Sequence, residues 1–102
     1  MPIAAALLLA GVTVVLPPEA TITGASIRLG DVAVVRSDDA AEAARFADFD
    51  LGFAPSPGFS RLLEDRWIGD RLHAAWPEVT IEFHGARAVR VWPRVERVSG
   101  EA

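Results

Sequence analysis

Residues 51–61 read LGFAPSPGFSR, and two prolines and two glycines fall within these eleven residues. Pro55 and Pro57 fix their own φ angles near −65° and keep the residues before them out of the helical region. Gly58 adds the backbone freedom that a Cβ would restrict. We therefore expect an extended segment to enter a rigid turn at Ala54 and to leave it as a second extended segment from Ser60 onward.

Short runs of β-branched and alternating apolar residues surround this turn and predict strands. They cover residues 12–16, 21–23, 26–29, 32–35, 51–54, 60–63, 79–83 and 86–92. The last two runs are separated by His84-Gly85 and therefore predict a C-terminal β-hairpin. Gly30-Asp31 is expected to be a turn or a cap.

Two helices are predicted, over residues 37–49 and 65–76. Asp39 and Glu42 have the spacing of a capping box at the start of the first. Ala43, Phe46 and Phe49 follow in a single apolar stripe. The prediction is one α+β domain over residues 11–98, with short, mostly antiparallel strands, two helices packed on one side and the C-terminal hairpin; residues 99–102 form a tail.

The composition limits the classes of protein to which the chain can belong. Its 102 residues suit one domain, and 51% of them are apolar, which is typical of a globular chain. Ten arginines, no lysine and fourteen acids give a net charge of −4, which argues against a nucleic-acid-binding protein. The chain has no cysteine, so disulfides and thiolate metal sites are excluded. The sequence sets no oligomeric state.

The first ten residues, MPIAAALLLA, carry no charged side chain. They resemble the apolar part of a secretory signal peptide without its basic start, and the alternative is a first buried strand. The run is too short to span a membrane, so no stable membrane anchor is expected.

No group of residues predicts catalysis or a cofactor. His73 and His84 lie eleven residues apart, which is not a metal-ligand spacing unless the fold adds a carboxylate. Ser60 lacks the Gly-x-Ser-x-Gly context of a hydrolase nucleophile, and Asp38-Asp39 lacks the spacing of a calcium loop. We therefore expect a protein that is not an enzyme and that uses neither cofactor nor metal.

Arginine gathers towards the C-terminal end and predicts the partner-binding residues. They are Arg87, Arg90, Trp92 and Arg94. Alternation along residues 86–92 predicts Arg90 and Trp92 on one face of the strand and Arg87 on the other. Arginine and tryptophan are enriched at the energetic centres of protein interfaces. An exposed edge strand over residues 86–92 would also pair with a strand of the partner. The alternative is a solvated edge whose charges and Pro93 oppose aggregation.

The order of these segments resembles the flagellar basal-body P-ring assembly chaperones, the FlgA family. The similar features are a strand followed by ITG and IRLGDVA (residues 22–24 and 27–33), an acidic alanine-rich helix, LGFAPSPGFSR (51–61), a Trp/Ile/Leu helix, and FHG before VRV (83–85 and 89–91). The resemblance runs from Val12 to Val98 and covers the N-terminal half of that family.

This resemblance implies a periplasmic, non-enzymatic protein whose partner is the flagellar P-ring protein. Family members continue into a C-terminal SAF-type module about as long again, so a missing module is expected after residue 98. Trp92-Pro93 also stands where the family commonly has arginine. Two alternatives stay open: a SAF-related module that binds carbohydrate or sugar acids by stacking on Trp67 or Trp76, and a truncated structural domain without activity of its own.

Overall fold

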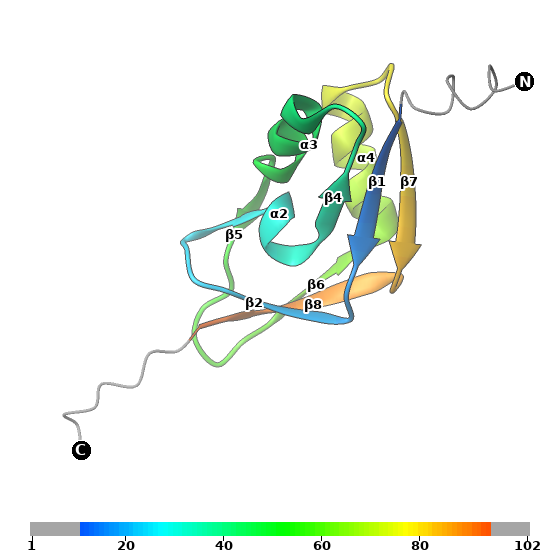
Figure 1. Cartoon of the computed structure of the whole chain (residues 1–102). Coiled ribbons are helices and arrows are strands. Elements are labelled where there is room, and N and C mark those ends of the chain that lie inside the picture. The colour runs from blue at the N-terminus through cyan, green and yellow to red at the C-terminus, as the bar shows by residue number, and fades with distance from the viewer. Residues whose placement is uncertain (1–10, 95–102) are drawn as a thin grey trace, which may run out of the picture.

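The computed structural model describes residues 11–94, which form eight strands and three helices (Figure 1). The strands are β1 (Gly11–Leu16), β2 (Glu19–Ile22), β3 (Ser26–Arg28), β4 (Val34–Arg36), β5 (Asp50–Phe53), β6 (Arg61–Glu64), β7 (Thr80–Gly85) and β8 (Ala88–Pro93). The helices are α2 (Leu29–Val32), α3 (Ala40–Ala47) and α4 (Asp65–Ala75). The fold is α+β, as predicted. The predictions for residues 1–10 and 99–102 lie outside the described residues.

The strands form two three-stranded sheets, in the orders β4-β1-β7 and β2-β8-β6, and a separate β3-β5 pair. β1 is parallel to β7 and β2 is parallel to β8, whereas the other three pairs are antiparallel. The segment that contains β1 and β2 therefore runs beside the segment that contains β7 and β8, and both pass from the first sheet to the second. The corner is fixed by two hydrogen bonds, from the Ala86 N–H to the Leu16 carbonyl (2.8 Å) and from the Arg90 N–H to the Pro18 carbonyl (2.9 Å).

The predicted C-terminal hairpin is wrong. β7 and β8 do not pair with each other, because β7 pairs with β1 and β8 pairs with β2 and β6. Gly85 has a φ of +89° and turns the chain into the second sheet without reversing it. Alternation indicated two strands here correctly, but it carries no information on which strands pair.

The predicted exposed edge strand over residues 86–92 is also wrong. β8 is the central strand of its sheet, with β2 on one side and β6 on the other. Its polar residues alternate because one face of the sheet meets solvent, a pattern that central and edge strands share. The backbone of β8 is therefore not available to a strand of another protein.

The proline-glycine stretch forms the turn expected of it. β5 ends at Phe53, and the Phe59 N–H donates to the Ser56 carbonyl at 2.9 Å. Gly58 takes a φ of +87°, a conformation that other residues rarely adopt. The chain then returns as β6, so this stretch links β5 of the two-stranded pair to the second sheet.

The one helix that the sequence did not predict, α2, contains the expected Gly30-Asp31 turn. The Asp31 carboxylate accepts the Arg28 N–H at 3.1 Å, so Asp31 caps this single helical turn. A Cβ on Gly30 would lie 2.9 Å from the Cβ of Ala47, at the end of α3. Glycine therefore lets α2 lie close against α3.

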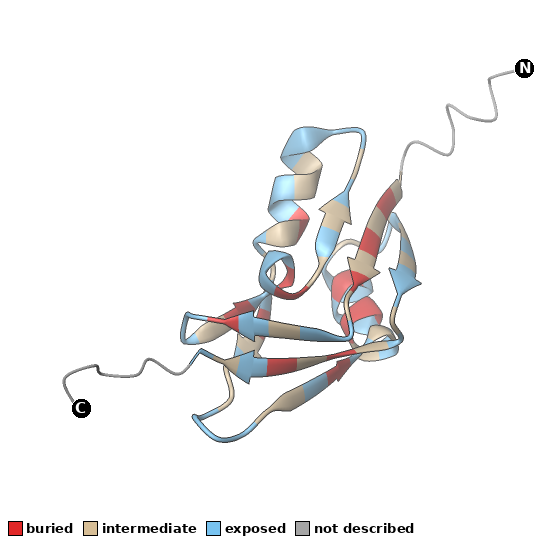
Figure 2. Ribbon diagram, turned by 60° about the horizontal axis from the view of Figure 1, so that its bottom comes forward, coloured by how far each residue is buried: buried red, intermediate tan, exposed pale blue. Residues whose placement is uncertain are grey.

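The core lies between the two sheets and the helices, and Figure 2 shows the buried residues in red on the strands and helices around it. β1 contributes alternate residues, and α4 contributes Ile68 and Leu72. Phe46 of α3 is fully buried and stacks on Trp76, with ring centroids 4.2 Å apart. No charged or polar side chain among the described residues is buried. The core is therefore held by apolar packing alone.

Asp39 begins α3, as the capping-box spacing predicted. Its carboxylate accepts the Ala41 N–H at 3.0 Å and the Glu42 N–H at 3.4 Å. The other half of the box differs, because the Glu42 carboxylate accepts the Ser37 hydroxyl (2.8 Å) and that hydroxyl accepts the Asp39 N–H (3.1 Å). The serine thus bridges the two acids.

Replacing Asp39 by alanine is expected to lower the free energy of unfolding by about 1 kcal/mol, because the first amides of α3 lose their acceptor. Urea denaturation followed by circular dichroism measures this loss. Asp38→Ala is the matched control, since Asp38 is an exposed neighbouring acid that does not cap the helix. Equal losses in the two variants would contradict the capping role.

Candidate binding surface

β8 presents two of the four predicted partner-binding residues on one face of its sheet. Val89 and Val91 are buried and point into the core. Arg90 and Trp92 alternate with them and therefore point outward. Trp92 is 38% exposed. The alternation predicted this placement correctly.

Strand register adds neighbours from β2 and β6 to this face. Arg90 lies between Glu19 of β2 and Leu62 of β6, and Thr21 lies beside Trp92. Leu62 is 49% exposed. We call this surface the β8 face; its members are Glu19, Thr21, Leu62, Glu64, Ala88, Arg90 and Trp92.

Arg90 is held in place on the β8 face. One guanidinium nitrogen, Nη1, donates to the Ser60 hydroxyl at 2.8 Å, and the side chain is half-buried. Ser60 is thus a positioning hydroxyl at the start of β6. Within residues 11–94 the guanidinium makes no second hydrogen bond, so its other N–H groups can meet acceptors on a partner, with less rotamer entropy to lose on binding.

Arg87 and Arg94 lie outside β8, one before its first residue and one after its last. Arg87 lies in the connection before β8, where its carbonyl accepts the Asp65 N–H at 2.9 Å. Arg94 follows the strand, and its N–H donates to the Ile22 carbonyl at 2.7 Å. Seven residues of extended chain separate them by about 23 Å. The structure therefore brings together Arg90 and Trp92, and it does not bring together the four predicted residues.

Sequence reasoning missed Leu62, Glu19 and Thr21 as members of the β8 face. Thr21 lies in an alternating run, so its outward orientation was readable, whereas Glu19 lies outside the predicted runs and Leu62 has an apolar neighbour in Leu63. Glu19 and Thr21 reach β8 through the parallel pairing of β2 with β8, which are 66 residues or more apart in the chain. Leu62 reaches Arg90 through the antiparallel pairing of β6 with β8, and no local signal encodes either pairing.

Trp67 and Trp76, the two tryptophans considered for sugar stacking, already contact other side chains. Trp76 stacks on Phe46 and has Phe49 at 5.5 Å. The guanidinium carbons of Arg61 and Arg71 lie over the ring of Trp67, at 5.3 and 5.1 Å from its centroid. A pyranose would have to displace these contacts, so the exposed indole of Trp92 offers a better surface than either.

Arg61 and Arg71 also cover the edge of β5 that does not face β3. The Nη1 of Arg61 donates to the Phe53 carbonyl at 3.1 Å, and the Nη2 of Arg71 lies 3.5 Å from the Asp50 carbonyl. Side-chain donors of this kind protect a strand edge from pairing with other chains.

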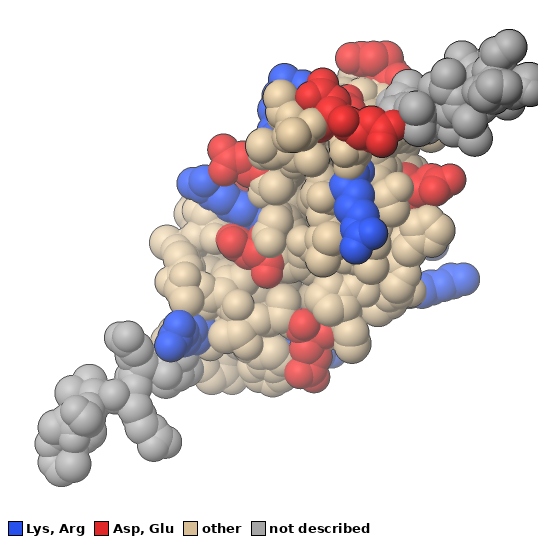
Figure 3. All heavy atoms as spheres, viewed as in Figure 1, with Lys and Arg blue, Asp and Glu red and all other residues tan. Residues whose placement is uncertain are grey.

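The remaining titratable residues do not converge. His73 lies on α4 beside an open groove, whereas His84 lies on β7, 3.3 Å from the Glu82 carboxylate. Between Gly11 and Arg94, no three residues of the metal-binding types lie together in a way that would hold an ion. Figure 3 shows acidic and basic side chains interspersed over the visible face, without a large field of one sign. None of the helices described is long and apolar enough to cross a membrane.

Comparison with known proteins shows the fold alone. No model of a known protein family matches the chain, and no curated protein is similar to it in sequence. Among solved structures, it is similar to the crystal structure of a functionally unknown protein from Eubacterium ventriosum ATCC 27560, with a TM-score of 0.73 and 15% identity. The match covers 83% of this chain and 98% of that one. The architecture therefore recurs in a distant protein of unknown function.

Proposed function

We propose that the chain is a non-enzymatic, periplasmic protein-binding module that assists assembly of the flagellar P-ring by holding the P-ring protein. Two independent lines support this proposal. The order of sequence segments resembles the N-terminal half of the P-ring assembly chaperones. The observation that carries the binding role is the β8 face. On it, the exposed side chains of Trp92 and Leu62 lie beside Arg90, whose guanidinium is held by the Ser60 hydroxyl.

The physical case rests on the composition and rigidity of this face. Tryptophan and arginine dominate the energetic centres of protein interfaces, and they bind best when they are already ordered. The β8 face lies on a three-stranded sheet whose inner side is core, so its backbone is fixed before a partner arrives. Because β8 is a central strand, a partner cannot pair with its backbone. The proposed binding therefore uses the outward side chains of the β8 face.

Trp92→Ala is expected to weaken binding to the P-ring protein of the same organism at least about tenfold, because it removes a central aromatic anchor. Isothermal titration calorimetry on the full chain measures the affinity. Val34→Ala is the matched control, since Val34 is 52% exposed but belongs to the other sheet. It should leave the affinity unchanged.

Two results would contradict this proposal. Absence of binding by a folded full-length sample would remove the P-ring protein as the partner. Equal losses in Trp92→Ala and Val34→Ala would remove the β8 face as the binding surface. Circular dichroism of each variant shows whether the fold is kept.

A further inference from the structure

β7 has one unpaired edge along its whole length. It pairs with β1 on one side, and no strand among residues 11–94 pairs with its other side. Figure 1 shows β7 at the border of its sheet. With six residues, it is longer than β2, β4 and β6, the other edge strands of the two larger sheets. A free edge of this length presents a row of backbone donors and acceptors that another strand can use.

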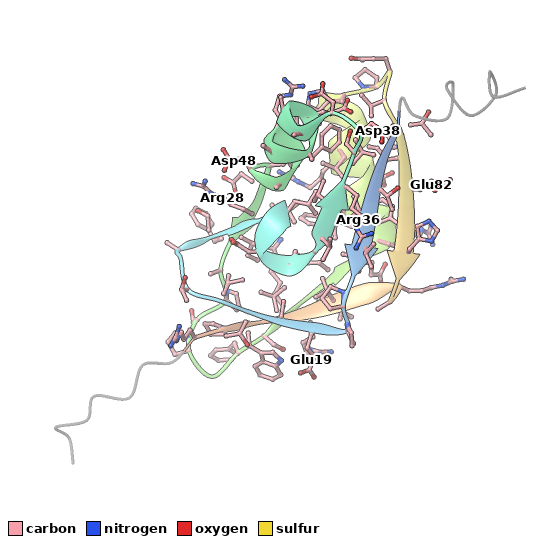
Figure 4. The ribbon with its side chains drawn as sticks, in the orientation of Figure 1. Glu19, Arg28, Arg36, Asp38, Asp48 and Glu82 are labelled. Carbon is pink, nitrogen blue, oxygen red and sulfur yellow. The ribbon has the colours of Figure 1, made fainter. Side chains whose placement is uncertain are left out.

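The two sides of β7 differ in a way that suits an added strand. Ile81 and Phe83 lie level with the buried Val12 and Val14 of β1 and point towards α4. Glu82 points to solvent on the opposite side (Figure 4). A further strand beside β7 would follow the same alternation, with every second side chain directed towards α4.

An open groove receives those side chains. It lies between α4 and β7, has a volume of about 350 Å³, and is lined by Asp65, Arg66, Gly69, Asp70, His73, Ile81 and Phe83. Gly69 helps to keep it open, because a Cβ there would lie 3.3 Å from the ring of Phe83. The two apolar side chains of β7 and the glycine form its apolar part, which suits small aliphatic side chains.

The charges around the groove favour a basic partner. Asp65 and Asp70 on α4 bring two carboxylates to the groove, against the single guanidinium of Arg66. Glu82 adds a third carboxylate to the same strand edge, on the face of β7 opposite the groove. A second copy of β7 would bring its own Glu82 to this edge and is therefore less well matched than a basic segment.

The edge of β5, unlike that of β7, is covered by side-chain donors that oppose pairing with another strand. There, the guanidinium of Arg61 donates to a strand carbonyl, and that of Arg71 lies beside another. In the part of the chain that the structure describes, no side chain hydrogen-bonds to the backbone of β7. The longer edge is thus left open while the shorter one is covered.

We propose that β7 binds an extended segment of a partner protein as the fourth strand of the β4-β1-β7 sheet. The segment places alternate small aliphatic side chains in the α4–β7 groove. Its basic side chains lie beside Asp65 and Asp70 on the groove side and beside Glu82 on the opposite face. This site is separate from the β8 face and does not depend on the proposed function.

The test uses the ¹⁵N-labelled full chain and the synthetic peptide RVTVTVTR, which alternates small aliphatic residues and carries a positive charge at each end. Titration should shift the amide signals of β7 and of α4 around Gly69 and slow hydrogen exchange in β7. The same peptide N-methylated at its four central amides should not bind, because neither of its edges can then donate to a strand. Replacing both arginines by glutamate should weaken binding at least about tenfold, through repulsion by the acids.

A charge reversal in the protein locates the site. Asp70→Arg should weaken binding of RVTVTVTR about threefold to tenfold. Asp38→Arg is the control, since it makes the same change at an exposed acid that does not line the groove, and it should leave the affinity unchanged. Both variants alter exposed side chains and should keep the fold.

Several outcomes would overturn the proposal. They are equal binding by the N-methylated peptide, signal shifts confined to the β8 face or to β4, and no shift at millimolar peptide. Protection of β7 that rises with protein concentration in the absence of peptide would assign the edge to a second copy of the chain instead.

Discussion

Gly85→Ala is expected to lower the free energy of unfolding by about 3 kcal/mol or more, the largest loss of any glycine substitution in the described residues. Gly85 has a φ of +89°, which strains any residue with a Cβ. An added Cβ would also lie 2.4 Å from the Leu16 carbonyl oxygen and 3.1 Å from the Leu16 amide nitrogen. Both contacts are with backbone, so the two strands at the corner would have to move apart.

Two other glycines separate these two causes. Gly58 has a similar φ of +87° but no neighbour within 4 Å of an added Cβ, so Gly58→Ala should cost only the backbone strain, about 1–2 kcal/mol. Gly24 needs no positive φ and has ordinary contacts, so Gly24→Ala should be neutral or slightly stabilising. Urea denaturation of the three variants gives the order. A Gly85→Ala loss no larger than that of Gly58→Ala would show that the corner yields without cost.

Local features of this chain were readable from its sequence. The prolines and glycine of residues 54–60 fixed a turn, and Asp39 marked the start of α3, because both effects act within a few residues. The alternating runs marked the strands for the same reason. Gly85 was recognised as a turning point, but the sequence did not say whether the chain would reverse or change sheets. That choice depends on β1 and β2, which lie more than 60 residues earlier.

The β8 face was readable only in part, for the same physical reason. Alternation placed Arg90 and Trp92 on one face, and the structure agrees. Alternation could not identify Leu62 or Glu19 as neighbours of Arg90, because these residues reach it through long-range strand pairing. The edge-strand prediction failed because one-sided solvation gives a central strand and an edge strand the same pattern. The free edge of β7 was hidden by its assignment to a hairpin.

Phe46→Ala is expected to lower the free energy of unfolding by about 3–5 kcal/mol, because it removes a fully buried aromatic side chain and leaves a cavity. The total stability of a domain of this size is about 5–15 kcal/mol, so the loss is a large part of it. Phe46 also stacks on Trp76 at 4.2 Å, a contact that adds about 0.5–1.5 kcal/mol beyond buried area. The stack joins α3 to the end of α4, and its loss frees one face of the indole.

Denaturation and tryptophan fluorescence measure this effect together. The midpoint of thermal unfolding should fall by more than about 10 °C, given about 4–8 °C per kcal/mol in a small domain. Phe53→Ala is the control, since Phe53 is 83% exposed and its removal should change stability by less than about 0.5 kcal/mol. A loss below about 1.5 kcal/mol in Phe46→Ala would mean that α3 repacks over the gap. In that case the two helices would be held mainly by Ile68, Leu72 and the sheets, and the Phe46–Trp76 stack would contribute little to stability.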